Sequence, residues 1–199
     1  MTPPLSPSHI AITGGIGSGK SFVCDILRRR GFGVYDCDAA AKRLMATDKD
    51  LQRELSQLVG NGVYSNGVLQ KSVLAQFILE SEDNKQAVNH IVHPAVAADY
   101  LSSGCQWLES AILFDANFDQ RVTFDIIIGV VAPDEVRTER IMTRDGISRE
   151  QALQWIACQM PQQTVASRCD YIISNGNGDD VEAQVEDICR KIKLLNIQT

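Results

Sequence analysis

The stretch that decides the fold is Gly14-Gly15-Ile16-Gly17-Ser18-Gly19-Lys20-Ser21, which matches the phosphate-loop pattern G-x-x-x-x-G-K-[ST] at every fixed position. Glycines let backbone N–H groups turn inward around phosphate oxygens, and a helix that follows adds partial positive charge. The lysine reaches the β- and γ-phosphates, and the serine hydroxyl is a ligand for Mg²⁺. The stretch therefore predicts an ATP site formed by residues from Gly15 through Phe22, with Lys20 catalytic.

The residues on both sides of this loop favour a functional phosphate site over a chance glycine-rich turn. An apolar run of strand length, His9 to Thr13, precedes the loop, and a helical pattern from Ser21 to Arg30 follows it. The motif binds phosphate in such a strand–loop–helix context. A GTPase would also need a guanine-reading Asn-Lys-x-Asp, and the one Asn-Lys pair, Asn84-Lys85, lacks the aspartate. The pattern therefore favours a kinase that uses ATP.

Apolar runs alternate with helical patterns along the chain. Further runs of strand length occupy 33–35, 107–113, 124–131 and 171–174. Continuous apolar strands separated by helices are typical of a parallel sheet that is covered on both faces. The sequence predicts an α/β fold, the three-layer α/β/α sandwich of P-loop kinases, with a five-stranded parallel sheet.

Two regions depart from the strand–helix alternation. Residues from about 39 to 103 show helical periodicity, interrupted by a Gly/Asn-rich break at 60–67, and we expect a helical insertion that binds the acceptor. Residues from about 140 to 165 are expected to form a lid. The core of this single kinase domain then comprises about 9–38, 104–139 and 166–199.

Composition excludes several classes of protein. The 199 residues are 44% hydrophobic and 22% charged, with a net charge of −6, which argues against nucleic acid or an anionic membrane as the main partner. Six cysteines include no C-x-x-C pair, so we expect reduced thiols and neither a zinc site nor a disulfide framework. The N-terminal residues do not resemble a signal peptide, and the longest apolar stretch is too short to span a bilayer. We expect a cytoplasmic protein.

A set of motifs in fixed order resembles the dephospho-coenzyme A kinases. The motifs are Thr13 to Ser21, Val34-Tyr-Asp-Cys-Asp38, His93-Pro94, Ser110 to Asp115, Arg140-x-x-x-Arg144-Asp145, Ser148 to Gln151 with Gln159-Met-Pro161, and Cys169 to Asn175. The resemblance implies transfer of the ATP γ-phosphoryl group to the ribose 3′-hydroxyl of dephospho-CoA, the last step of coenzyme A synthesis. It also implies Mg²⁺ as cofactor, ATP and dephospho-CoA as partners, and the strand order second-third-first-fourth-fifth.

Three positions depart from the family pattern. Ala111-Ile-Leu-Phe-Asp115 stands where the family usually has Pro-Leu-Leu-Phe-Glu, Val165 replaces a basic residue, and Arg137 replaces a glutamine. These departures concern contacts to the acceptor and within the lid. A P-loop kinase of another acceptor, such as a nucleotide or shikimate, is the alternative function, and a nucleotide-regulated binding protein without turnover is the alternative of another class. The oligomeric state is not predicted.

Two aspartates follow the second strand, at the edge where open α/β sheets place their sites. The resemblance makes Asp38 the candidate base that accepts the 3′-hydroxyl proton, with Asp36 the second choice, and both contact the acceptor. An alternative interpretation is that Asp38 caps the helix that follows. His93 and Asp115 are further acceptor candidates, although a lone histidine is as often structural.

The remaining candidates serve the metal and the triphosphate. Glu109 ends an apolar run beside the phosphate loop, and with Ser21 it would hold Mg²⁺. Arg140 and Arg144 are candidate catalytic clamps on the triphosphate, and Arg144 also binds ATP. Arg137 and Arg149 belong rather to a solvated helix face paired with nearby glutamates. Asn175, in the turn after the last strand, is a candidate for the adenine edge or an ordinary turn residue.

Overall fold

The computed structural model describes residues 9–195, in two compact units. The core unit contains residues 9–35 and 105–195, and the helical unit contains Asp36–Gly104. The N-terminal segment that we expect not to be a signal peptide lies outside the described residues. Within residues 9–195, no helix combines the length and the apolar character needed to cross a membrane.

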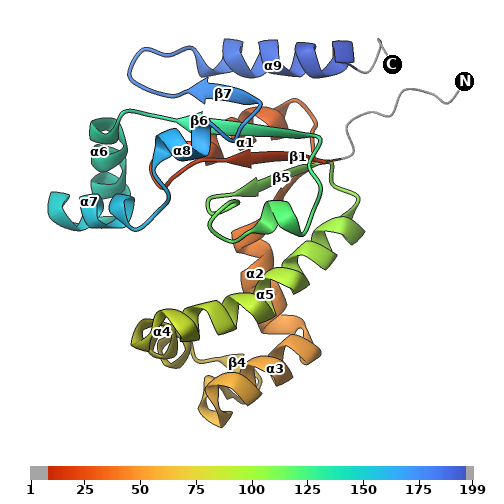
Figure 1. Ribbon diagram of the computed structural model, residues 1–199, viewed down its shortest axis with the longest axis vertical. Coiled ribbons are helices and arrows are strands. Elements are labelled where there is room, and N and C mark those ends of the chain that lie inside the picture. Colours follow the sequence, from red (N-terminus) through yellow and green to blue (C-terminus); the bar gives the residue numbers. More distant parts are fainter. Residues whose placement is uncertain (1–8, 196–199) are drawn as a thin grey trace, which may run out of the picture. The chain divides into compact units, whose positions relative to one another are not determined.

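The core unit is built on a five-stranded sheet in the order β2-β5-β1-β6-β7. The strands are β1 (Ile10–Thr13), β2 (Val34–Asp36), β5 (Trp107–Ser110), β6 (Ile126–Val131) and β7 (Tyr171–Ser174). β1 pairs in parallel with β5 and β6, and β6 pairs in parallel with β7. Because β5 and β6 are the third and fourth strands of this sheet, the predicted order is confirmed, and with it the α/β sandwich fold (Figure 1).

The predicted end of β5 is wrong by three residues. The strand stops at Ser110, and turns lead from there to a short 3₁₀ helix, η2 (Phe118–Gln120). Leu113 and Phe114 are nevertheless buried in these turns. A buried turn has the same apolar character as a buried strand, so the run of apolar residues did not reveal the boundary.

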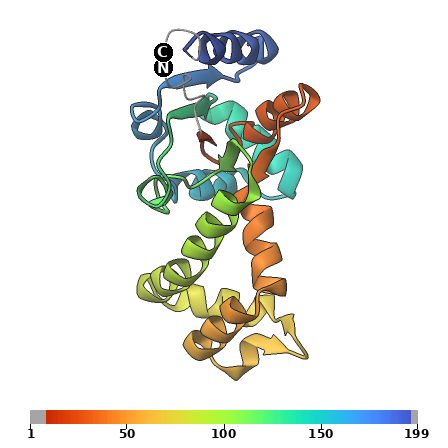
Figure 2. The same cartoon turned by 90° about the vertical axis from the view of Figure 1, so that its right-hand side faces the viewer.

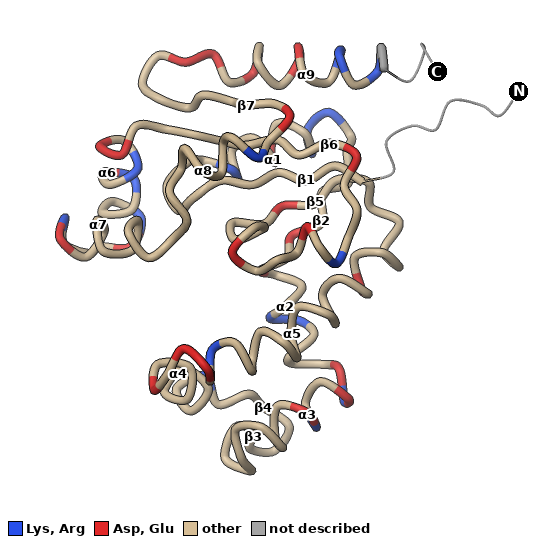
Figure 3. Tube along the Cα trace, viewed as in Figure 1, with Lys and Arg blue, Asp and Glu red and all other residues tan. Residues whose placement is uncertain are grey.

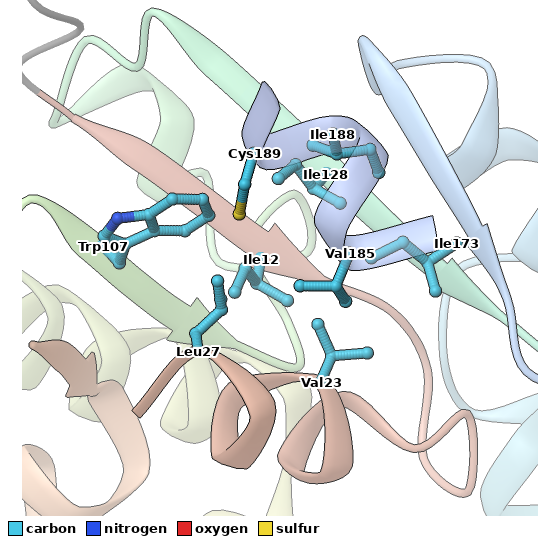
Figure 4. Close-up of a pocket in the computed structure, with 9 residues that line it drawn as sticks. All are labelled: Ile12, Val23, Leu27, Trp107, Ile128, Ile173, Val185, Ile188 and Cys189. Atoms are coloured by element: carbon cyan, nitrogen blue, oxygen red, sulfur yellow. The ribbon is translucent and has the colours of Figure 1, made fainter. Parts of the chain in front are cut away.

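Two helices pack on one face of the sheet (Figure 4). They are α1 (Lys20–Arg29) and α9 (Val181–Leu195). Side chains from four strands meet both helices around a cavity of about 10 Å³, whose lining is Ile12, Val23, Leu27, Trp107, Ile128, Ile173, Val185, Ile188 and Cys189. The lining is apolar and the space holds at most one water, so the cavity is a packing gap in the core and not a ligand site.

Three further helices complete the core unit. They are α6 (Asp134–Asp145), α7 (Arg149–Ala157) and the short α8 (Gln162–Ala166). α6 packs against α7, and α8 packs against β6. Ser148 begins α7 with a capping box, because its hydroxyl accepts from the Gln151 N–H while the Gln151 side chain accepts from the Ser148 N–H.

The helical unit consists of four helices and a small hairpin (Figure 2). The long helix α5 (Glu82–Ser103) packs against each of the others, α2 (Cys37–Thr47), α3 (Lys49–Val59) and α4 (Lys71–Glu80). The 3₁₀ helix η1 (Asn61–Val63) leads from α3 into an antiparallel hairpin of β3 (Tyr64–Ser65) and β4 (Val68–Leu69). The Gly/Asn-rich sequence of this stretch predicted only a break in the helical pattern.

The turn of this hairpin is Asn66-Gly67, with φ angles of 50° and 77°. Positive φ at both central residues matches the right-handed twist of the two strands, which is why Asn-Gly is the strongest short-range signal for a hairpin. That signal was present in the sequence. The strands flanking it are only two residues long, and too few alternating residues were available for a strand pattern to be recognised.

We predict that Leu27→Ala lowers the free energy of unfolding of the core unit by about 2–5 kcal/mol, because the deleted side chain already lines the cavity and would enlarge it. Leu153→Ala is the matched control, since Leu153 is 43% exposed whereas Leu27 is 1% exposed. Denaturant unfolding measures both. Equal losses for the two variants would contradict the packing of α1 on the sheet.

Candidate active site

The phosphate loop, Gly14–Ser21, joins β1 to the first turn of α1. Gly19 precedes the helix in the left-handed region, with φ of 90°, and a Cβ at this position would lie 1.9 Å from Nδ2 of Asn175. Only glycine fits there on both counts. Lys20 and Ser21 therefore occupy the first turn of α1, where N–H groups and the helix dipole favour an anion. Lys20 Nζ donates to the Gly15 carbonyl oxygen over 3.3 Å.

Side chains from outside the loop bind its carbonyl oxygens. Nε of Arg137 donates to the Ile16 oxygen over 2.9 Å, and Nδ2 of Asn175 donates to the Ser18 oxygen over 2.8 Å. Arg140 approaches the Gly17 and Ser18 oxygens at 3.4 Å, and it also lies 3.3 Å from Oδ1 of Asn175. These bonds hold successive peptide planes of the loop, and so limit the directions in which its N–H groups can point.

Ser21 and Glu109 lie side by side at the ends of α1 and β5. The Ser21 hydroxyl donates to Oε1 of Glu109 over 3.3 Å, and the Glu109 side chain is mostly buried. Arg28 lies 3.9 Å from the other carboxylate oxygen. The structure thus brings together a hydroxyl and a carboxylate, the oxygen ligands that Mg²⁺ prefers.

The carboxylate of Glu109 also affects the thiol of Cys24. Burial, and to a smaller extent the neighbouring Glu109, raise the pKa of Cys24 far above the usual thiol range.

Figure 3 shows that basic and acidic residues both occur along α6 and α7. The arginines there, at positions 137, 140, 144 and 149, have different partners. Arg149 forms two hydrogen bonds of 2.6 Å with Glu135, which lower the pKa of that carboxyl, so the solvated pair that the sequence suggested is present. Arg144 is exposed and pairs with Asp145. The prediction for Arg137 is wrong: its side chain is buried against the phosphate loop. Positions 137 and 140 are three residues apart on a helix and therefore share the face that meets the loop.

A short segment after α7 is fastened to three places in the core unit. We call Gln159–Gln162 the strap. Oε1 of Gln159 accepts from the Ile16 N–H over 2.7 Å, and the Met160 N–H donates to Oδ1 of Asp115 over 3.2 Å. Oε1 of Gln162 accepts from the Ala132 N–H over 3.0 Å. Gln159 lies in one of the motifs, but no role was predicted for it, and Asp115 was predicted to contact the acceptor.

A surface pocket of about 430 Å³ opens beside the phosphate loop. It is lined by Phe22, Asn175 and residues 178–182. Phe22 is 47% exposed and offers an apolar face, while Asp179, Asp180 and Glu182 make part of the pocket wall acidic. A planar base could stack on such a ring, and the acidic wall suits a base that carries hydrogen-bond donors.

Three predicted acceptor residues belong to the helical unit. Oδ1 of Asp36 accepts from the Ala39 N–H over 2.9 Å, which makes Asp36 the N-cap of α2. Asp38 is exposed in the first turn of α2, so the interpretation of Asp38 as the cap is wrong. The helix starts two residues earlier than a cap at Asp38 would require. His93 lies within α5, immediately before Pro94.

Comparisons with known proteins agree on one family. The family model for dephospho-CoA kinase matches residues 8–180. A dephospho-CoA kinase of Bacteroides fragilis (strain YCH46) is 40% identical over 177 residues, 83% of either chain. A crystal structure of a Thermus thermophilus protein matches with a TM-score of 0.77 and 31% identity, over 96% of this chain and 98% of that one. Shikimate kinase from Acinetobacter baumannii matches with a TM-score of 0.55 and 15% identity, over 96% of this chain and 95% of that one. At this identity the likeness shows a common fold only.

We predict that Asn175→Ala lowers the free energy of unfolding by about 1–3 kcal/mol, because it removes the donor that satisfies the buried Ser18 oxygen. Asn177→Ala in the same turn is the control, since Asn177 is exposed and its replacement should change stability by less than about 0.5 kcal/mol. Thermal unfolding without nucleotide measures both variants. A harmless Asn175→Ala would show that the loop does not depend on this bond.

Proposed function

The chain belongs to the dephospho-CoA kinase family, and we propose that it transfers the γ-phosphoryl group of ATP to the ribose 3′-hydroxyl of dephospho-CoA. This reaction is the last step of coenzyme A synthesis. The observation that carries the proposal is an intact phosphate loop whose Ser21 hydroxyl meets Glu109, in a chain that the family model matches over residues 8–180.

The core unit supplies the ATP site of this proposal. Backbone N–H groups of the phosphate loop and the start of α1 hold the phosphates, and Lys20 exchanges the Gly15 oxygen for the β- and γ-phosphate oxygens. The adenine stacks on Phe22 in the adjacent pocket, where Asn175 forms part of the wall. Arg140, already at the loop, and Arg144, at the end of α6, neutralise charge on the phosphoryl group as it is transferred.

Ser21 and Glu109 fit a magnesium ion. Mg²⁺ is usually held by one or two protein oxygens together with substrate phosphates, and these two residues provide a hydroxyl and a carboxylate 3.3 Å apart next to the loop. Held by Ser21 and Glu109, such an ion would supply positive charge that offsets the charge of the phosphates. The structural role of the pair does not depend on the metal, because the Ser21–Glu109 hydrogen bond already joins α1 to β5.

Asp38 is the proposed base for the acceptor hydroxyl. The carboxylate of Asp36 is engaged by the Ala39 N–H, whereas Asp38 is exposed in the first turn of α2. Phosphoryl transfer needs an acceptor hydroxyl held in line and a carboxylate that takes its proton late. In this proposal Asp36 shapes the start of α2 and orients the acceptor, and His93 contributes to acceptor binding.

The acceptor specificity is tested by a coupled assay for ADP. We expect Mg²⁺-dependent ADP formation with dephospho-CoA and little with AMP or shikimate. Lys20→Ala should abolish turnover and leave the thermal unfolding midpoint unchanged within a few degrees, because a loop lysine supports no core. Turnover of AMP or shikimate with dephospho-CoA inert would refute the assignment of substrate.

The roles of the two aspartates separate in the variants Asp38→Asn and Asp36→Asn. Asparagine caps a helix about as well as aspartate, so Asp36→Asn should keep α2 intact and retain most of the activity. Asp38→Asn should cut kcat by about 10²–10⁴, the usual contribution of a general base, with ATP affinity unchanged. Steady-state kinetics and ATP titration measure these quantities. A collapse of kcat in Asp36→Asn alone would instead assign the base to Asp36.

A further inference from the structure

The tip of the phosphate loop has little intrinsic rigidity. Ile16 is flanked by Gly15 and Gly17, and Gly17 adopts a φ of 77°. Glycine has access to more backbone conformations than any other residue, so the peptide planes on either side of Ile16 rotate easily unless other groups hold them. A phosphate cradle acts through N–H groups that already point at the phosphate before it arrives. Something outside the loop must therefore fix its tip.

Two side chains bind the tip, one on each peptide plane beside Ile16. Oε1 of Gln159 accepts from the Ile16 N–H over 2.7 Å, which fixes the plane between Gly15 and Ile16. Nε of Arg137 donates to the Ile16 oxygen over 2.9 Å, which fixes the plane between Ile16 and Gly17. Both distances are those of well-formed hydrogen bonds. We call Arg137 and Gln159 the clamp.

The clamp residues are themselves held in place. NH1 of Arg137 donates to Oδ1 of Asp134 over 2.9 Å, and the arginine side chain is only 4% exposed. Gln159 begins the strap, whose next residue is fastened to Asp115 through the Met160 N–H. The tip of the loop is thus tied to α6 and to the turns after β5. Neither clamp residue is free to follow the tip if it moves.

The clamp also explains why position 15 is glycine. A Cβ on Gly15 would lie 2.4 Å from NH2 of Arg137 and 3.1 Å from Oε1 of Gln159. The space that a side chain would need is therefore filled by the two groups that hold Ile16. Since the backbone of Gly15 is not in the left-handed region, this close approach, and not the φ angle, accounts for the glycine.

We propose that Arg137 and Gln159 are positioning residues for phosphoryl transfer, which act by fixing the two peptide planes beside Ile16. The proposal rests on the proposed kinase function for its effect on turnover, but its effect on nucleotide binding does not require that function. Neither residue needs to touch the reacting atoms. Because the clamp acts on the phosphate site, its loss should impair the use of ATP and leave the affinity for the acceptor unchanged.

The test uses two nearly isosteric variants of the full chain. Arg137→Lys keeps the positive charge and loses the guanidinium fork, and Gln159→Met keeps the length and loses the acceptor oxygen. We expect kcat/KM for ATP to fall about 10- to 100-fold for Arg137→Lys, as for a lost hydrogen bond from a charged group, and about 3- to 10-fold for Gln159→Met. KM for dephospho-CoA should change by less than about twofold. The double variant should lose less than the product of the single losses, because both residues hold one element.

Matched controls separate positioning from stability. Arg149→Lys changes an exposed arginine of the same region that pairs with Glu135, and Gln52→Met changes a buried glutamine whose amide donates to the Ala46 oxygen in the helical unit. Gln52→Met should lower the unfolding midpoint without changing ATP affinity. Arg149→Lys should change neither quantity.

ATP affinity of each variant is also measured by calorimetry with the nucleotide alone. Weaker ATP binding in both clamp variants supports the proposal whichever acceptor the enzyme uses. Failure of dephospho-CoA to act as acceptor would refute only the proposed substrate. Wild-type ATP affinity and wild-type kcat in both folded variants would overturn the clamp. Full activity of Arg137→Lys would overturn the role of Arg137, since charge alone would then suffice. If Arg137→Lys failed to fold, Gln159→Met would decide, because Gln159 is only partly buried.

Discussion

The hydrogen bond from the Asn175 amide to the Ser18 carbonyl oxygen, 2.8 Å long and buried, is the constraint on which the phosphate loop depends. It joins the turn after β7 to the loop after β1, across the strand β6 that lies between them in the sheet. The same amide fills the space where Gly19 has no Cβ, so the start of α1 is fixed by the end of β7. The parallel sheet brings these two ends together, and the phosphate loop takes its shape from that arrangement.

Much of the fold followed from local patterns, and the errors occurred where local patterns are ambiguous. Strand-length apolar runs located every strand of the large sheet, and the family resemblance supplied their order. The end of β5 was misplaced because Leu113 remains buried after the strand ends. The cap of α2 was misplaced by two residues, because Asp36 and Asp38 are equally good caps and only the backbone conformation distinguishes them.

The candidate site was predictable where its residues lie in one motif and less so where they meet from distant parts of the chain. The phosphate loop and Glu109 could be recognised because a strand end beside the loop is a fixed feature of the fold. The burial of Arg137 could not be recognised from the sequence, since a helix with charges on several sides does not reveal which side meets the core. Gln159 is 143 residues from Ile16, and an uncharged side chain that binds a backbone N–H leaves no pattern in the sequence.

The helical unit is one uninterrupted segment, Asp36–Gly104, inserted between strands that pair with each other in the sheet. This arrangement has a consequence for folding kinetics. Contacts inside the segment span at most the length of the segment itself, such as the 56 residues between Arg43 and Asp99, whereas pairing of β1 with β5 must close a longer loop, from Ile10 to Trp107. α5 packs against α2, so a segment that folds early would shorten the effective loop between β2 and β5. Early folding of the helical unit would then speed the pairing of β2 with β5, the strands that precede and follow it in the chain.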